Sequence, residues 1–298
     1  MHQQLVGIDW GTSNRRAYLI DRDGACLATQ EDNQGMLAAR GRFAESLAEL
    51  LARMQVGAGV PVLMSGMVGS ASGWREVPYL DTGVALDALP AHLVRVDNHD
   101  LGRDCFIVPG YCQREGGIDV MRGEETQLFG AMALGRRTGW VVLPGTHSKW
   151  VLLRDGVIEN ISTYMTGELF ASLAAQGTLA PLMADGDDDA AFDAGVAEAW
   201  LRAPLTNSLF RVRARVVSGA MPAAHARGFI SGLLIGTEFM AAIDAGDGAP
   251  SSVSLIASAA LHQRYVRAAA LFGIDATQLD PHRVYLAALS QFLSKAAI

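Results

Sequence analysis

The sequence predicts an α/β protein made of two similar halves. Short apolar segments of strand length alternate along the chain with longer segments of helical periodicity, a mixture typical of this class. Two strand pairs are also alike: 6–20 and 141–153 each contain an apolar strand, a Gly-Thr turn and a second apolar strand. Half of the 298 residues are hydrophobic, so a substantial core is available for one large domain or two of ordinary size.

The first of these hairpins bends at 11–14 and the second at 145–149, and each is followed by an Asp-Gly reversal typical of hairpins. Glycine lets a backbone approach a ligand closely, and Thr and Ser add hydroxyl donors, a combination that suits phosphate oxygens. Such a turn taken alone is more often an ordinary β-turn. Its recurrence in the same setting favours phosphate binding, with both turns converging on one ligand if the halves face each other.

Charged residues beside the two turns fit the same interpretation. Asp9 directly precedes the first turn and is placed to hold a hydrated magnesium ion next to phosphates. Lys149, together with Arg15 or Arg16, adds positive charge. The sequence therefore indicates a site for a phosphate ligand and its metal ion.

The remaining segments continue the alternation of strands and helices. The apolar patterns predict strands at 61–64, 106–110 and 253–256, and helices at 43–54, 128–134, 192–201, 229–243 and 261–272. A polar turn at 163–170 starts a further helix. Strands and helices therefore occur in both halves.

Two polar segments are candidates for substrate contacts. The loop 65–74 is rich in Gly and Ser, which is costly to order, and loops on rigid scaffolds often contact substrates. A plain surface loop is equally consistent with its composition. At 119–125, charged residues precede an apolar helix. They are either first-turn carboxylates that interact favourably with the helix dipole, or they include a carboxylate aimed into the cleft between the halves.

Several classes of protein are disfavoured by composition. The formal net charge is −7 and there is no basic block, which argues against binding nucleic acid. The first residues lack the pattern of a signal peptide, and the apolar stretch 229–243 is shorter than the roughly 20 residues that span a bilayer. Three cysteines lack zinc-ligand spacing. We expect a cytoplasmic protein with no membrane partner.

Six motif segments form an ordered set along nearly the whole chain: 9–16, 65–79, 120–127, 144–150, 165–168 and 231–236. Together they resemble the 2-dehydro-3-deoxygalactonokinase family, in the sugar-kinase branch of the actin, Hsp70 and hexokinase superfamily. The resemblance implies two ribonuclease-H-like domains, 1–137 and 138–298, with ATP in the cleft between them. It also implies transfer of the γ-phosphoryl group to the 6-hydroxyl of 2-dehydro-3-deoxy-D-galactonate, a small-molecule substrate.

The resemblance also implies roles for single residues. The first phosphate motif would comprise Asp9, which holds Mg²⁺, with Gly11, Thr12, Ser13 and Asn14. The second would comprise Gly145, Thr146, His147, Ser148 and Lys149. Ser258 would approach adenosine, although the neighbouring 256–260 carries Ala where related proteins usually place Gly.

Catalysis and recognition of the sugar acid require further side chains. Glu124 resembles the acidic residue that begins the helix after the last strand of the first domain in related sugar kinases, and we expect it to be the general base, with Asp119 as the alternative. An acidic substrate needs a positive or donor-rich pocket. The candidates for it are Arg16, Ser70, Trp74, Arg122 and Thr166.

Two other functions remain open from sequence: an actin-like or Hsp70-like ATPase switch, and an inactive sugar-binding protein. The chain shows no additional partner-binding domain and no DNA-binding segment, which weighs against both. The preference between the galacto and gluco forms of the keto acid depends on one or two hydrogen bonds and stays open. Oligomeric state also stays open, with an isologous homodimer the commonest arrangement among soluble enzymes.

Overall fold

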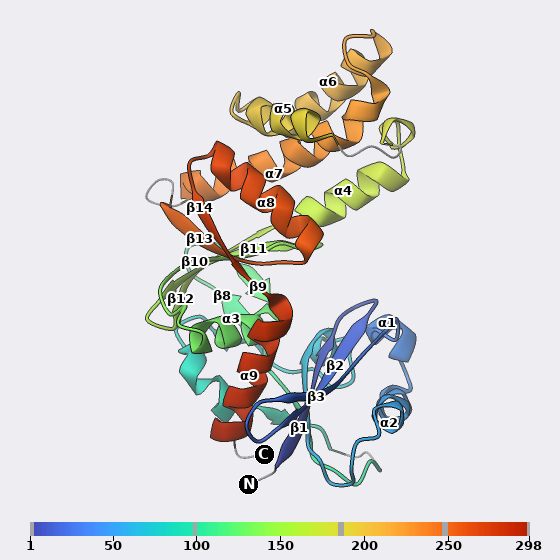
Figure 1. The fold of residues 1–298 in the computed structure, drawn as a ribbon, viewed down its shortest axis with the longest axis vertical. Coiled ribbons are helices and arrows are strands. Elements are labelled where there is room, and N and C mark those ends of the chain that lie inside the picture. The colour runs from blue at the N-terminus through green and yellow to red at the C-terminus, as the bar shows by residue number, and fades with distance from the viewer. Residues whose placement is uncertain (1–2, 98–99, 184–187, 246–249, 297–298) are drawn as a thin grey trace. The chain divides into compact units, whose positions relative to one another are not determined.

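The computed structural model describes residues 3–97, 100–183, 188–245 and 250–296 (Figure 1). Its contacts divide the chain into two compact units. The first unit comprises Met1–Thr138, Leu152–Ile161 and Asp280–Ile298, and the second comprises Gly139–Val151 and Ser162–Leu279. Both contain strands and helices, so the predicted α/β class is confirmed.

A six-stranded sheet forms the centre of the first unit, in the order β3-β2-β1-β4-β7-β6. The strands are β1 (Gln4–Trp10), β2 (Arg15–Asp21), β3 (Cys26–Asp32), β4 (Val62–Gly66), β6 (Val94–Arg95) and β7 (Cys105–Ile107). β1 pairs antiparallel with β2, as the predicted hairpin requires, and parallel with β4. The carboxyl ends of β1 and β4 therefore meet at one edge of the sheet.

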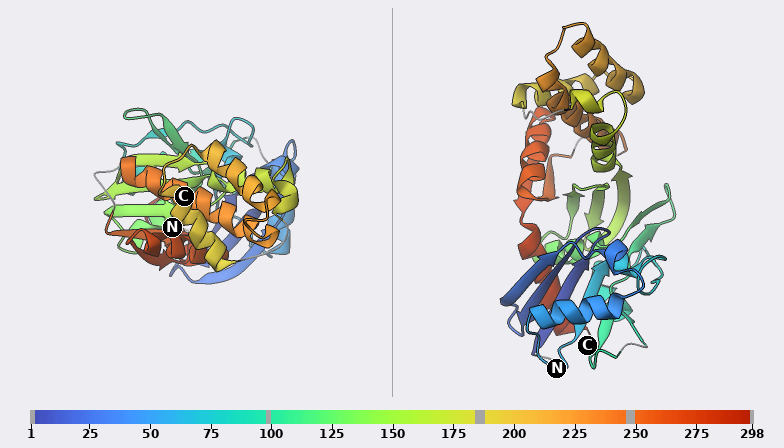
Figure 2. Two further views of the ribbon diagram at one scale, coloured as in Figure 1. Left: turned by 90° about the horizontal axis from the view of Figure 1, so that it is seen from above. Right: turned by 90° about the vertical axis from the view of Figure 1, so that its right-hand side faces the viewer.

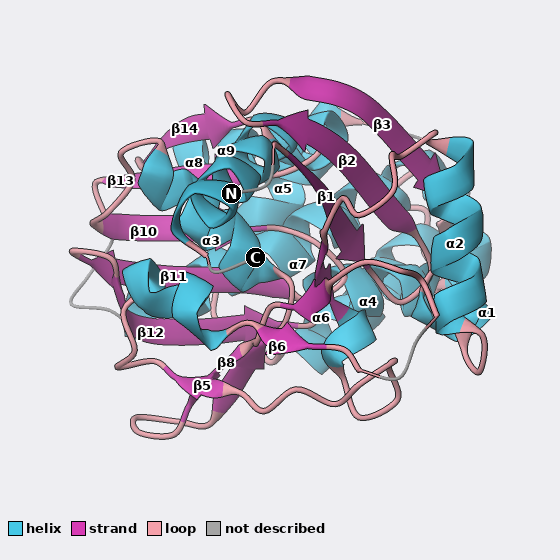
Figure 3. Cartoon of the chain, turned by 90° about the horizontal axis from the view of Figure 1, so that it is seen from below, coloured by secondary structure: helices cyan, strands magenta, loops and turns pink. Residues whose placement is uncertain are grey.

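Helices cover both faces of this sheet. They are α1 (Met36–Ala39), α2 (Phe43–Arg53), α3 (Glu124–Ala133) and α9 (Pro281–Lys295). Figure 2 shows α2 lying across one face of β1 to β3, and Figure 3 shows α9 on the other face. Alternate β1 residues point to opposite faces, so Ile8 packs in the α2 cluster whereas Gly7 faces Leu289 of α9. Asp9 shares the face of Gly7.

The C-terminal helix α9 belongs to the first unit although it lies at the end of the chain. It packs closely on α3, because a Cβ on Gly130 would lie only 2.0 Å from the carbonyl oxygen of Val284. The expected division at residue 138 assigns this helix to the second domain, whereas the contacts assign it to the first unit. The first unit also contains a small sheet of β5 (Leu80–Asp81), β8 (Tyr111–Gln113) and β9 (Asp119–Met121).

The second unit is built on a five-stranded sheet in the order β12-β11-β10-β13-β14. Its strands are β10 (Gly139–Leu143), β11 (Ser148–Arg154), β12 (Val157–Tyr164), β13 (Ser252–Ile256) and β14 (Asp275–Leu279), of which β11 and β12 continue into the first unit. The helices of this unit are α4 (Thr166–Ala175), α5 (Asp189–Ala199), α6 (Leu205–Val217), α7 (Ala226–Ala245) and α8 (Ala259–Leu271).

Helix α7 is the core helix of the second unit. Glycines allow its tight packing on α5, because a Cβ on Gly195 would lie 2.1 Å from the Phe229 carbonyl oxygen and one on Gly232 would lie 2.0 Å from that of Phe192. Among the described residues, Ala223–Ala245 has the length and hydropathy of a membrane span, but 72% of its apolar window is buried inside the protein. Its apolar character is therefore explained by packing.

Candidate functional site

The start of α1 holds the first Gly-Thr turn from one side. Three backbone N–H groups donate to consecutive turn carbonyls: Gly35 to Ser13, Met36 to Gly11 and Leu37 to Thr12, at 3.0, 2.9 and 3.1 Å. In a planar trans peptide, the carbonyl and the N–H that follows it point in opposite directions. The N–H groups of Thr12, Ser13 and Asn14 therefore point away from α1. This row of donors is suited to an anion.

Helix α4 holds the second Gly-Thr turn in a similar way. The N–H of Glu168 donates to the carbonyl oxygen of Thr146 at 2.9 Å, and a Cβ on Gly167 would lie 2.2 Å from the carbonyl oxygen of Gly145. The His147 side chain pairs with Glu168. The two turns are similar in sequence, and each is also held by backbone contacts from the start of a helix.

Glycine at position 145 is not required by the protein itself. A Cβ there would have no neighbour within 4 Å, and the residue has no positive φ. By contrast, a Cβ on Gly35 would lie 2.3 Å from the carbonyl carbon of Ser13. Gly35 is therefore needed for packing of the first turn, whereas Gly145 leaves open space beside the second turn.

Asp9 lies near the end of β1, next to a glycine of the neighbouring strand. Gly66 has a φ of 91°, and a Cβ there would lie 2.8 Å from the Trp10 carbonyl oxygen and 3.5 Å from Asp9 Oδ1. Burial and the Glu124 carboxylate raise the pKa of Asp9 to about 6, although the Arg16 guanidinium opposes both effects. Asp9 is therefore mostly ionised at neutral pH and lies within electrostatic reach of Glu124.

The turn from β9 into α3 places Glu124 near Asp9. Gly123 has a φ of 113°, and its Cβ would lie 3.2 Å from the Cα of Gly66, so the two glycines bring this turn against the end of β4. The carboxylate of Glu124 accepts the N–H of Arg122 at 3.0 Å, and that of Glu125 accepts the N–H of Gly123 at 2.6 Å. Glu124 therefore both accepts a backbone N–H at the start of α3 and lies near Asp9.

Asp119 lies farther from this turn. It is the first residue of β9, and its Oδ1 accepts the N–H of Val120 at 2.7 Å. A strand advances about 3.3 Å per residue, so Asp119 sits roughly 7 Å before the end of β9 at Met121. The geometry therefore favours Glu124 over Asp119 as the carboxylate beside Asp9.

Arg122, in the turn before Glu124, contacts the end of the segment that follows the Gly- and Ser-rich loop 65–74. Its Nη2 donates to the carbonyl oxygen of Val77 at 2.7 Å, and its guanidinium lies 4.2 Å from the ring centre of Tyr79. The Nε and Nη1 groups are buried and have no hydrogen-bond partner among the described residues. Buried donors are rarely left unpaired, which makes this guanidinium a candidate for a ligand oxygen.

The other expected substrate residues of the first unit make contacts within the protein. Ser70 Oγ donates to the carbonyl oxygen of Met67 at 2.8 Å, and the Trp74 ring stacks at 6.2 Å on that of Phe43. Arg16 pairs with Glu31 of β3 at 2.9 Å. These contacts order the loop and the hairpin, and a role for these side chains in substrate binding stays a prediction.

A pocket of about 190 Å³ lies in the second unit. The second Gly-Thr turn and helices α4, α7 and α8 line it, with Gly145, Thr166, Phe170, Ser231, Arg264 and Tyr265 among the lining residues. Arg264 Nη1 donates to Ser231 Oγ at 2.8 Å. Thr166, expected at the sugar acid, thus lies beside this pocket. Ser258 is an exposed residue that directly precedes α8.

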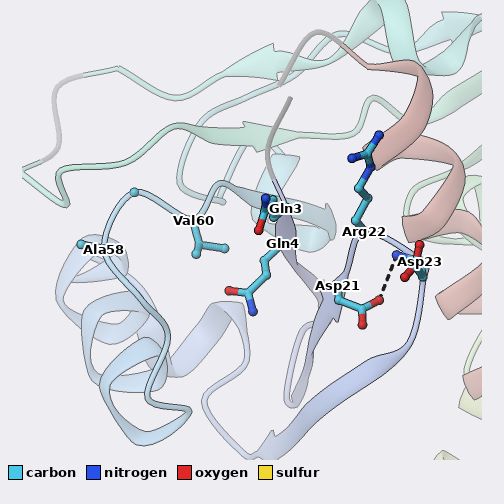
Figure 4. Close-up of a pocket in the computed structure, with 8 residues that line it drawn as sticks. Gln3, Gln4, Asp21, Arg22, Asp23, Ala58 and Val60 are labelled. Atoms are coloured by element: carbon cyan, nitrogen blue, oxygen red, sulfur yellow. Dashed lines mark hydrogen bonds between the residues drawn. The ribbon is translucent and has the colours of Figure 1, made fainter.

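A more open hollow of about 580 Å³ lies at the other end of β1, with a lining that includes Gln3, Gln4, Asp21, Arg22 and Val60 (Figure 4). Asp21 accepts the backbone N–H groups of Asp23 and Ala25 at 3.0 and 2.9 Å, so this carboxylate closes the turn after β2. None of the candidate site residues is among those that line the hollow.

A hairpin turn on each of two sheets, with a carboxylate near the end of the first strand, places the chain in the class of proteins with the actin-like ATPase fold. Distantly related solved structures, a xylulose kinase among them, share this fold at 10–13% identity and TM-scores of 0.50–0.51. The chain belongs to the 2-keto-3-deoxy-galactonokinase family, whose model matches residues 9–292. The family inferred from the sequence motifs is therefore confirmed.

Individual relatives from this family align with the chain along almost their full length. The chain is 40% identical over 293 residues to the "Probable 2-dehydro-3-deoxygalactonokinase DgoK1" of Rhizobium meliloti, covering 96% of this chain and 95% of that protein. It is 35% identical to the 2-dehydro-3-deoxygalactonokinase of Escherichia coli, covering 93% of each. A crystal structure of a family protein from Sinorhizobium meliloti superposes with a TM-score of 0.89 at 39% identity, covering 97% of this chain and 95% of that chain.

Proposed function

We propose that this protein is a carbohydrate kinase that transfers the γ-phosphoryl group of ATP to the 6-hydroxyl of 2-dehydro-3-deoxy-D-galactonate. The products are ADP and 2-dehydro-3-deoxy-6-phospho-D-galactonate. The observation that carries the proposal is the family match over residues 9–292, supported by two relatives of that activity at 40% and 35% identity. Nothing in the described structure favours the ATPase switch or the inactive sugar-binding protein.

Phosphoryl transfer needs positioning and charge stabilisation more than covalent participation by the protein. In the proposal, the outward N–H groups of 12–14 and the turn 145–149 bind phosphate oxygens of ATP. The open space beside Gly145 supports this assignment, because a phosphate can approach the backbone there without meeting a side chain. The pocket of the second unit is the proposed site for the adenosine part of the nucleotide.

Asp9 is the proposed residue for the magnesium ion. Among the described residues, no group of three or more His, Cys, Asp and Glu side chains is arranged to hold a metal. Mg²⁺ in kinases is bound by one or two carboxylates with water and substrate phosphates, so a single ionised Asp fits it. When bound, the ion neutralises charge on the transferring phosphoryl group.

Glu124 is the proposed general base. As the O6–phosphorus bond forms and the bond to ADP breaks, the proton of the 6-hydroxyl passes to the Glu124 carboxylate. The hydrogen bond from the Arg122 N–H orients this carboxylate. Arg122 also has two buried donors without a partner among the described residues, which supports it as a ligand for the acidic substrate.

ADP release measured with and without the keto acid tests the proposal. Keto-acid-dependent ADP release supports the kinase, whereas slow hydrolysis that the keto acid does not stimulate would support the ATPase switch. Absence of nucleotide turnover together with keto acid binding would support the inactive sugar-binding protein. The gluco isomer, assayed in parallel, measures the stereochemical preference.

The setting of this activity is also part of the proposal. We propose a cytoplasmic enzyme that acts on a small molecule, with neither nucleic acid nor membrane as a partner. A net charge of −7 and the burial of helix α7 support this. An isologous homodimer is the assembly to test first, by light scattering.

A further inference from the structure

Glu238 is a buried carboxylate in the middle of α7. Its exposed fraction is 2%. Four side-chain donors contact it: Ser148 Oγ and Trp150 Nε1 reach Oε1, both at 2.7 Å, and Tyr265 OH at 2.8 Å and Thr166 Oγ1 reach Oε2. An ionised carboxylate has about four lone-pair positions, so its capacity to accept hydrogen bonds is filled.

The four donors come from three separate elements around the pocket of the second unit. Ser148 and Trp150 belong to β11, the strand that leaves the second Gly-Thr turn. Thr166 is the first residue of α4, and Tyr265 lies on α8. Both Thr166 and Tyr265 line the pocket together with Gly145. One carboxylate therefore fixes the turn and two walls of the pocket to α7.

Stability alone is a weak explanation for this arrangement. Burying a carboxylate costs free energy, and well-packed apolar residues of similar volume are often at least as stabilising as a buried polar network. The four hydrogen bonds to Glu238 fix the orientation of each donor group, which an apolar residue at this position would not do. The arrangement therefore points to a requirement for geometry at the pocket.

We propose that Glu238 is a positioning residue that sets the second Gly-Thr turn and the pocket walls for the nucleotide. This inference rests on the proposed function, in which the same pocket receives adenosine. Glu238 does not itself touch the ligand in this account. It acts through Ser148, Thr166 and Tyr265.

Glu238→Gln tests the proposal, because the amide keeps the shape but has only one accepting oxygen. We expect KM for ATP to rise about tenfold, with KM for the keto acid near the wild-type value. The matched control is Glu198→Gln. Glu198 is a nearly buried carboxylate of α5 that accepts a hydrogen bond from Arg215 at 2.8 Å, and it does not line the pocket. The control should lower the melting temperature without changing KM for ATP.

A second pair of variants covers the case in which Glu238→Gln does not fold. Thr166→Val removes one donor to the carboxylate and should raise KM for ATP about two- to fivefold. Thr237→Val removes the neighbouring hydroxyl, which donates to the Leu233 carbonyl oxygen at 2.7 Å, and should leave KM unchanged. A Thr166→Val enzyme in which only KM for the keto acid rises would overturn the inference and support Thr166 as a sugar-acid ligand.

Calorimetric titration with ADP separates this inference from the proposed function. If wild-type protein binds ADP but releases none from ATP in the presence of the keto acid, the proposed function fails, and weaker ADP binding by Glu238→Gln would still support the positioning role. If the wild type is an active kinase and Glu238→Gln binds ADP as tightly as Glu198→Gln does, the positioning role is overturned.

Discussion

Glycines 35 and 145 lie beside the two Gly-Thr turns for different physical reasons. A Cβ at 35 would overlap the backbone of the first turn, at 2.3 Å from the carbonyl carbon of Ser13, whereas a Cβ at 145 would meet nothing within 4 Å. The first glycine is required for folding of the turn. The second is not required by packing, and the open space beside it is where we propose that a phosphate of ATP binds.

Gly145→Ala is therefore expected to separate binding from stability. An alanine in an unstrained position stabilises a protein by about 0.4–1 kcal/mol through the unfolded state, so the melting temperature should be unchanged or slightly higher. KM for ATP should rise about tenfold or more, because the methyl group takes the space proposed for a phosphate. Gly83→Ala is the control, since a Cβ there also meets nothing within 4 Å. A Gly145→Ala enzyme with normal KM would contradict the phosphate assignment.

Glu124→Gln is expected to keep the fold and ATP binding while lowering kcat by about 10²–10⁴-fold, the usual contribution of a general base. The amide oxygen of the substituted side chain can still accept the Arg122 N–H, which preserves the turn. Single-turnover measurements of phosphoryl transfer check the loss. The control is Asp119→Asn, which should keep kcat within a few-fold of wild type. If Asp119→Asn loses turnover and Glu124→Gln does not, Asp119 is the base.

At the scale of elements, the start of α3 carries the proposed general base, Glu124, next to a second carboxylate that is fully buried, Glu125. Glu125 is fully buried, and burial together with the adjacent Glu124 carboxylate raises its pKa from 4.5 to about 8. Its Oε2 accepts the N–H of Gly123, and its Oε1 accepts Thr126 Oγ1 at 3.3 Å. At neutral pH, Glu125 is therefore mostly protonated in the folded state and ionised in the unfolded state.

This difference makes the free energy of unfolding depend on pH. Because the folded state binds more protons, the contribution of Glu125 is fully present below about pH 4.5 and is lost as pH rises through about 8. The total change is on the order of a few kcal/mol. Glu125→Gln removes it, so the variant should gain stability relative to wild type between about pH 5 and about pH 8.5 in urea titrations. A constant difference across this range would contradict the raised pKa.

At the scale of the whole molecule, the end of the chain completes the unit formed by its beginning. Tyr285 of α9 hydrogen-bonds Ser65 at the end of β4 at 2.9 Å, across 220 positions of sequence. Phe292 packs against Phe129 of α3 with ring centres 4.8 Å apart. Helix α9 thus covers the face of the sheet on which Asp9 lies.

Deleting residues 280–298 is therefore expected to unfold the first unit, because it exposes one face of its sheet and the apolar side of α3. Circular dichroism should show loss of a cooperative transition, and limited proteolysis should cleave the chain before residue 138. The control is a chain that ends at Lys295, the last residue of α9, and it should melt like the wild type. A truncated chain that melts at the wild-type temperature would contradict the assignment of α9 to the first unit.

The sequence by itself determined the α/β class, the two hairpins and the family. These features depend on local patterns: alternating apolar residues form β1 and β2, Gly and Thr form the bends, and six motif segments occur in one order. The helices at 43–54 and 261–272 were predictable for the same reason, since their apolar residues repeat at helical spacing.

Only the tertiary structure decided which distant residues meet. No local pattern brings α9 to the first sheet, places four donors around Glu238, or sets Gly66 against Gly123 beside Asp9. Such contacts join residues far apart in sequence, and they form because packing of whole elements buries enough apolar surface to offset the lost chain entropy. The candidate site residues could therefore be proposed from the sequence, whereas the contacts that hold them in place could not.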